Sequence, residues 1–222
     1  ALRWLLAVAA LVAAYLLFWP TPLDPYAWTP PLDPGTGPGS PFRPTQQLRS
    51  DDDLAQSVIQ AKFGDAGRPV NFGPEDVAVR PGEGRVYTGI GDGNILSIDP
   101  ASGETRFFAN TGGRPLGVTF DAAGDTLYVA DAKLGLLSVD RAGSVSVLAN
   151  EADGEPATFA DNLDVAGDGT VWFSAPTREH TLAQVTLDVW DSRPTGRLLR
   201  YDPQTKTASV KLDNLFYANG VA

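Results

Sequence analysis

The sequence predicts an all-β fold of the β-propeller class, and two observations support this. From Gly73 onward, short runs of alternating apolar and polar residues are separated by turns rich in Gly, Asp and Pro, a pattern typical of β-strands. These runs recur as a unit, because Val118 follows Val77 by 41 positions and Leu163 follows Val118 by 45. Four short strands at a spacing of about 40–50 residues are typical of propeller blades. A β-sandwich also has many short strands, but it would not repeat itself at this period.

Three such units align along the chain, and a fourth opens at Asn219. We expect strands at 75–79, 85–89, 94–100 and 105–108, then at 116–120, 126–130, 135–140 and 144–148, and finally at 161–165, 170–174, 196–203 and 207–211. Residues 175–194 are an insertion between the second and third strands of the third unit. Closed propellers have about four to eight blades. We therefore expect about three blades here, in a chain without Met that is a fragment at both ends.

The composition excludes several classes of partner and site. The net charge is −10, so a phosphate-binding surface is not expected and nucleic acid is excluded as a partner. The chain contains no Cys, which excludes disulfides and thiolate metal sites.

The N-terminal segment reads as a membrane anchor. Residues 4–19 are an uncharged apolar run, WLLAVAALVAAYLLFW, with Trp at both ends and Arg3 in front of it. Trp suits both membrane interfaces and the positive charge favours the cytoplasmic side, so residues 1–20 are expected to be a single-pass signal anchor. The propeller would then lie on the periplasmic or extracellular side. A cleaved signal peptide and a buried core helix are the alternatives.

A spacer separates this anchor from the propeller. Residues 21–70 begin with a stretch dense in Pro and Gly, which favours an extended linker, and continue with a short helix expected at 51–62 behind the acidic start Asp51–Asp53. Residues 71–222 are then the N-terminal half of the propeller.

One register of the repeat carries oxygen-bearing side chains. The first strand of each blade lines the central channel, so equivalent positions from different blades converge on one axis. The position two residues before the first apolar residue of each inner strand holds Glu75, Leu116, Asp161 and Asn219. Carboxylate and amide oxygens suit a divalent cation, Ca²⁺ first. In a register one residue later, Asp76 or Asn162 would share this role, and the alternative is that these residues are merely turn formers.

Four motifs carry a family resemblance. The chain resembles the strictosidine-synthase-like family, which is related to the gluconolactonase and paraoxonase propellers, in the segments 113–117, 159–165, 193–203 and 217–221. The resemblance implies a six-bladed propeller, and membrane-anchored members of the family share the N-terminal anchor. In the related enzymes a Glu of the first blade and an Asn before the fourth inner strand bind Ca²⁺, which implies Glu75 and Asn219 here. The third-blade ligand would be Asp161, or Asn162 if the register slips by one.

The resemblance implies a metal-dependent hydrolase of lactones or aryl esters, with such a molecule as its substrate. The alternatives are an amine–aldehyde condensing enzyme of the strictosidine synthase type and a non-catalytic binding propeller with a structural metal. Paraoxonases place a His where this chain has Leu116, and Leu has no titratable group. We expect the only His, His180, to be an exposed loop residue, so the catalytic residues stay unassigned.

Overall fold

Three four-stranded antiparallel sheets make up most of the chain that the structure describes. The computed structural model describes residues 73–222, together with Val8 and Leu11. The first sheet contains β1 (Val77–Val79), β2 (Val86–Gly89), β3 (Asn94–Ile98) and β4 (Thr105–Asn110). The second contains β5 (Pro115–Phe120), β6 (Leu127–Asp131), β7 (Gly135–Val139) and β8 (Val145–Ala149). The third contains β11 (Leu163–Val165), β12 (Val171–Ala175), β13 (Gly196–Asp202) and β14 (Thr207–Leu215).

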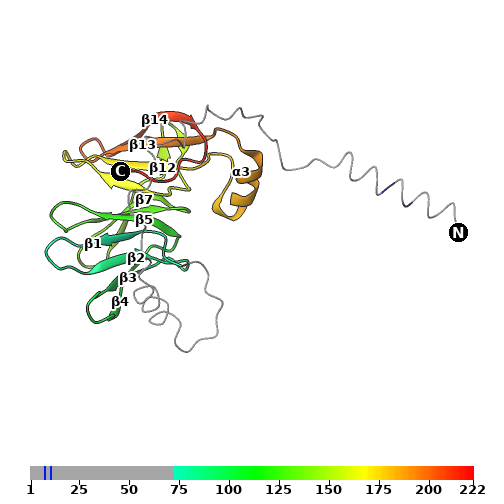
Figure 1. Cartoon of the computed structure of the whole chain (residues 1–222). Helices are drawn as coiled ribbons and strands as arrows, with labels where there is room; N and C mark the ends of the chain where they lie inside the picture. The colour runs from blue at the N-terminus through cyan, green and yellow to red at the C-terminus, as the bar shows by residue number, and fades with distance from the viewer. Residues whose placement is uncertain (1–7, 9–10, 12–72) are drawn as a thin grey trace, which may run out of the picture.

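The sheets are consecutive blades of a β-propeller, as the repeat predicted. In each sheet the strands lie in chain order, and each pairs antiparallel with the next. The first strands β1, β5 and β11 pack against one another, so they line the inside of the arc. Figure 1 shows the three sheets side by side, from the first blade in cyan-green to the third in yellow and red.

Two apolar cores fill the spaces between neighbouring blades. The core between the first and second blades is built from alternate residues of both sheets, among them Tyr87, Ile95, Val118, Leu127 and Val139. The core between the second and third blades includes Leu136, Leu163, Val171, Phe173 and Leu199. The alternation of the sequence therefore places one face of each strand in each core, and burial of these side chains holds the blades together.

A cation lies inside the first of these cores. Arg80 is only 6% exposed, and its guanidinium carbon lies 4.7, 5.2 and 4.9 Å from the ring centroids of Tyr87, Phe108 and Phe120. Two rings come from the first blade and one from the second. The planar guanidinium is attracted to the faces of all three, so Arg80 links two blades through cation–π contacts.

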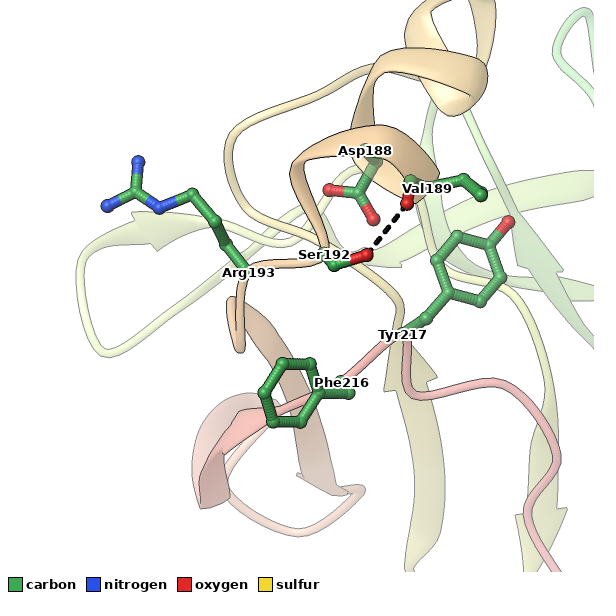
Figure 2. A pocket seen from close by; sticks show the side chains of 6 residues that line it. All are labelled: Asp188, Val189, Ser192, Arg193, Phe216 and Tyr217. Atoms are coloured by element: carbon green, nitrogen blue, oxygen red, sulfur yellow. Dashed lines mark hydrogen bonds between the residues drawn. The ribbon is translucent and has the colours of Figure 1, made fainter. Parts of the chain in front are cut away.

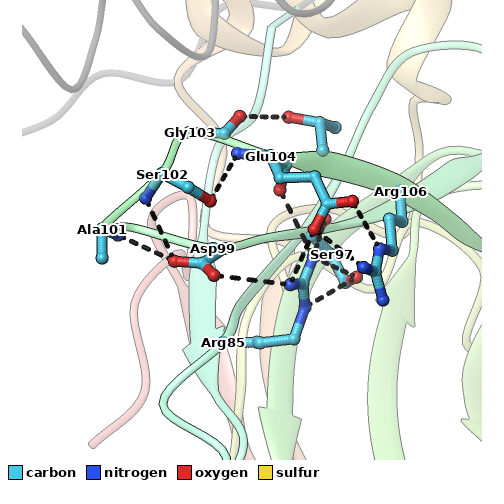
Figure 3. A network of polar contacts seen from close by, with 9 residues as sticks. Arg85, Ser97, Asp99, Ala101, Ser102, Gly103, Glu104 and Arg106 are labelled. Carbon is cyan, nitrogen blue, oxygen red and sulfur yellow. Dashed lines mark hydrogen bonds and ion pairs between the residues drawn. The ribbon is translucent and has the colours of Figure 1, made fainter.

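The outer strands of the first blade carry a polar network (Figure 3). Arg85 donates through Nη2 to the backbone carbonyl of Ser97 at 3.1 Å, and its side chain is 17% exposed. Arg106 pairs with Glu104 at 2.8 Å, but both of these side chains are largely exposed. Backbone N–H groups of the turn that follows Asp99 lower the pKa of that carboxyl. This network stabilises the β3–β4 turn, far from the inner strands.

The insertion of the third blade contains two short helices, which the sequence had not indicated. They are the 3₁₀ helix η1 (Leu182–Gln184) and the α-helix α3 (Val185–Asp191). Because Leu163 pairs with Phe173, β12 ends at the same end of the sheet where β11 begins. The insertion therefore starts at that end, which we call the channel mouth. A small hairpin, β9 (Glu151–Ala152) with β10 (Glu155–Pro156), joins the second blade to the third.

The predicted anchor, linker and first helix lie outside the described residues, apart from Val8 and Leu11, which are helical. Within the part of the chain that the structure does describe, no helix is both long and apolar enough to cross a membrane.

Candidate functional site

Asp161 is the most unusual polar residue at the channel mouth. Its backbone N–H donates to the carbonyl of Ser174 on β12 at 3.0 Å, which fixes it at the start of β11. The residue is only 4% exposed, and its Oδ2 atom has no hydrogen-bond partner. Burial, and after it the charge of Glu75, raises the pKa of Asp161 to about 7. A buried carboxylate with an unsatisfied oxygen is costly to keep ionised, and a bound cation is one way to offset that cost.

Glu75 and Tyr217 share this environment. Glu75 is exposed at the start of the first inner strand, and its charge acts on both Asp161 and Tyr217. Burial raises the pKa of Tyr217, and the charges of Asp161, Asp188 and Glu75 add to the shift. Arg114 bonds to the segment that carries Glu75, because its Nη2 donates to the carbonyl of Gly73 at 3.1 Å. The structure thus brings the predicted residues of the first and third blades into one electrostatic cluster.

Asn219 is held next to Asp161 through its backbone. The Ser174 hydroxyl donates to the carbonyl oxygen of Asn219, while the Ser174 carbonyl accepts from the N–H of Asp161. A single residue of β12 therefore joins the starts of the third and fourth units. The side chain of Asn219 is exposed at the channel mouth.

Asn162 has a different set of contacts. Its Oδ1 accepts the backbone N–H of Val221 at 2.9 Å, and its Nδ2 lies 3.5 Å from Oδ2 of Asp76. Both ends of the amide are therefore used inside the protein. Asp76 also accepts the backbone N–H of Val118 at 3.0 Å, so it bonds to the second blade.

The four predicted residues thus divide into two groups. Glu75, Asp161 and Asn219 gather at the channel mouth, whereas the Asn162 side chain is turned to neighbouring blades. Over residues 73–222, three or more His, Cys, Asp or Glu side chains do not converge in a way that would hold a metal ion by themselves. A cation here would need the Asn219 amide, backbone oxygens or water in addition to the two carboxylates.

The comparisons with known proteins agree with this architecture. A family model described as strictosidine synthase matches residues 161–222, and one described as the N-terminal part of strictosidine synthase-like proteins matches residues 66–98. Two curated relatives from Arabidopsis thaliana, strictosidine synthase-like proteins 7 and 6, are each 37% identical over 67% of this chain. The chain belongs to the strictosidine synthase-like family. It spans 41% of the length of either relative.

The strictosidine synthase-like fold extends to enzymes of distant sequence. A solved gluconolactonase from Xanthomonas campestris superimposes with a TM-score of 0.52 at 16% identity, covering 70% of this chain and 54% of its own. At that identity the likeness shows the fold alone. It supports the assignment of the three sheets as propeller blades.

An apolar wall adjoins the acidic cluster in this strictosidine synthase-like chain. Leu116, Ala132 and Phe159 form a small buried cluster, against which Leu182 and Val185 of the insertion pack. Leu116 stands in the same register as Asp161, so one side of the channel mouth is apolar and the other is acidic. The wall comes from two blades and the insertion, which explains why the repeat alone did not reveal it.

His180 lies in a loop, as predicted, but the prediction that it is exposed was wrong. Its side chain is 11% exposed, and Nε2 lies 2.9 Å from Oδ2 of Asp191, which is itself 4% exposed. The pair joins the start of the insertion to the end of α3. His180 is therefore a packed residue that holds the insertion together, because its partner lies one helix further along the chain.

A pocket of about 210 Å³ lies beside α3 (Figure 2). Figure 2 shows that α3 and the turn after it contribute one side, while Phe216 and Tyr217 contribute the other from the segment after β14. The residues that line it are Asp188, Val189, Ser192, Arg193, Phe216 and Tyr217. Tyr217 connects this pocket to the acidic cluster.

Two aromatic residues adopt an unusual backbone just before the candidate ligands. Phe159 has φ of 62° and Tyr217 has φ of 46°, and each stands two residues ahead of a candidate ligand, Asp161 and Asn219 respectively. Bulky residues rarely adopt a left-handed backbone, and such strain tends to gather at functional sites. In the sequence, an aromatic residue followed by Ala and then by Asp or Asn occurs at both places. This repeated pattern could have revealed the two aromatic positions.

Proposed function

We propose that this strictosidine synthase-like propeller binds a divalent cation, Ca²⁺ first, at the mouth of a six-bladed channel. Glu75, Asp161 and Asn219 would hold it. The observation that supports this best is the unsatisfied, buried Oδ2 of Asp161 beside a second carboxylate, an arrangement that a cation relieves. The Asn162 amide is left out of the proposed ligand set because both of its ends already have partners.

We propose that the activity is hydrolysis of lactones or aryl esters. A bound cation would supply polarisation of the substrate carbonyl. The buried cluster of Leu116 and Phe159, which Leu182 covers, would keep water away from one side of that carbonyl. We assign no catalytic base among the described residues: Leu116 has no titratable group, and His180, only 11% exposed, packs against Asp191 within the insertion.

Membership of the family also favours a second candidate. The match to strictosidine synthase over residues 161–222 suggests condensation of an amine with an aldehyde. A non-catalytic propeller that holds its cation for structure is the third possibility. Chelation separates the hydrolase from the other two possibilities, because only the hydrolase depends on the cation for turnover.

The test is Ca²⁺ titration calorimetry and ester and lactone hydrolysis with the full-length protein, with and without chelator. Asp161→Ala should weaken Ca²⁺ binding more than tenfold, because a charged ligand is lost. Asp164→Asn is the matched control, because Asp164 is exposed three residues further along. Turnover that survives chelation, together with unchanged Ca²⁺ affinity in the Asp161 variant, would rule out the proposal.

We further propose that residues 1–20 anchor the protein in a membrane, with the propeller on the non-cytoplasmic side. The uncharged run between Trp4 and Trp19 and the preceding Arg3 support this. Alkaline carbonate extraction and protease protection would test it. Release by carbonate, or protection of the propeller on the cytoplasmic side, would contradict it.

A further inference from the structure

The residue that follows each candidate ligand position alternates in kind around the arc. It is Asp76 in the first blade, Gly117 in the second, Asn162 in the third and Gly220 at the start of the fourth unit. Polar side chains with two functional ends therefore alternate with glycines. The alternation cannot be seen within one strand. It appears only when the equivalent positions of successive blades are compared.

The polar side chains bond to the backbone just after the glycines. Asp76 Oδ2 accepts the N–H of Val118 at 3.0 Å, and Asn162 Oδ1 accepts the N–H of Val221 at 2.9 Å. The Asn162 amide also donates to Asp76 across a long 3.5 Å contact. We call this set of contacts, made by Asp76, Asn162 and the N–H groups of Val118 and Val221, the blade clasp. It connects the second blade to the first, the first to the third, and the third to residue 221.

Glycine is required at one of these positions for space. A Cβ added at Gly117 would lie 2.7 Å from the carbonyl oxygen of Asp161 and 2.8 Å from the Cα of Asn162. Such distances are too short for any side chain, so only glycine lets the second and third blades approach closely enough for the clasp to form. The close approach also involves the carbonyl of Asp161, a candidate ligand.

The clasp flanks the candidate cation ligands without being part of them. Asn219 precedes Val221 by two residues, and its own carbonyl accepts from Ser174. The segment from Asn219 to Val221 is thus held by two bonds to the third blade, one from Ser174 and one from Asn162. These two bonds hold the backbone of this segment against the third blade.

We propose that Asn162 is a positioning residue, which fixes the segment 219–221 against the third blade and so sets the register of Asn219 relative to Asp161. Its consequence for cation binding rests on the proposed function. Its action on the backbone does not, because the bond from the Val221 N–H to Asn162 involves the side chain of none of the proposed cation ligands.

A double-mutant cycle in the full-length protein tests the route of action. Asn162→Ala removes the acceptor, and Val221→Pro removes the N–H donor, while Val221→Ala keeps the donor and serves as the matched control. Each disruptive change should weaken Ca²⁺ binding by about five- to tenfold, the usual worth of one hydrogen bond. The double variant should be no weaker than either single one, because both changes remove the same bond.

Hydrogen exchange at the Val221 amide, measured without calcium, gives a second reading. Exchange should be at least tenfold faster in Asn162→Ala than in the wild type, and unchanged in Asp164→Asn. Equal exchange in wild type and Asn162→Ala would overturn the proposal whatever the cation does. The proposal would also be overturned if the losses of Ca²⁺ affinity were additive and Val221→Pro bound Ca²⁺ almost as tightly as the wild type. That pattern is expected if Asn162 bound the cation directly. A wild type that binds no Ca²⁺ but shows the exchange difference would overturn the proposed function and support the positioning role.

Discussion

Replacing Asp161 by Asn should make the calcium-free protein more stable, and increasingly so as the pH rises. The carboxyl is 4% exposed, one of its oxygens lacks a partner, and Glu75 adds a like charge. Its pKa is accordingly raised from 3.8 to about 7 in the folded protein. Between these values the folded state keeps a proton that the unfolded state has lost, so the free energy of unfolding falls as the pH rises.

The magnitude follows from the same numbers. At about 1.4 kcal/mol for each tenfold change in proton affinity, a pKa raised from 3.8 to about 7 destabilises the ionised protein by about 4 kcal/mol above pH 7. Asp161→Asn cannot ionise, so its advantage over the wild type should grow from near zero at pH 4 to about this size at pH 8.

Chemical denaturation in chelator at several pH values between 4 and 8 measures this difference. Asp164→Asn, which changes an exposed residue of β11 three positions further along, should show no such growth with pH. Saturating Ca²⁺ should remove most of the advantage at pH 8, because the cation compensates the wild-type carboxylate. Parallel stability curves for wild type and Asp161→Asn across the whole pH range would refute the reasoning.

Three further outcomes are expected from denaturant unfolding. Gly117→Ala should lower the free energy of unfolding by about 1–3 kcal/mol, because its Cβ would meet the Asp161 carbonyl at 2.7 Å; a loss below about 0.5 kcal/mol would show that the blades can move apart freely. Arg80→Lys should cost about 1–2 kcal/mol, since a compact, strongly hydrated ammonium is poorer than a guanidinium at contacting three rings, and an unchanged midpoint would argue against the cation–π contacts. Arg106→Ala should change stability by less than about 0.5 kcal/mol because its ion pair is exposed, whereas Arg85→Ala, which loses a partly buried bond to backbone, should cost at least twice as much; the reverse order would contradict this assignment.

Most of what the sequence predicted about the fold came from its internal repeat. The strand expected at 170–174 is β12, Val171–Ala175, and the one expected at 94–100 is β3, Asn94–Ile98. Alternation and period report directly on strands because each side chain faces one core or the other. They say nothing of α3, which is only seven residues long and whose insertion is held by packing on Leu116 and by the bond from His180 to Asp191.

The candidate site was predictable in its positions but not in its contacts. Equivalence of register was enough to single out Glu75 and Asp161 as neighbours, and their electrostatic interaction is present in the structure. Register also places Asp76 and Asn162, 86 positions apart, at equivalent positions, but it does not show that the Asn162 amide bonds to Asp76 instead of facing a cation. Tertiary contacts of that separation leave no trace in local pattern.

Each candidate ligand position is followed directly in the sequence by a position of the clasp register. This adjacency bears on which residues of the scaffold can be replaced. In the second blade the first of the two positions already holds an apolar residue, Leu116, yet the N–H of Val118 still bonds to Asp76. An apolar residue at the candidate ligand position of this blade thus leaves the adjacent clasp bond intact. Loss of a polar side chain there is compatible with the contacts that hold the first and second blades together.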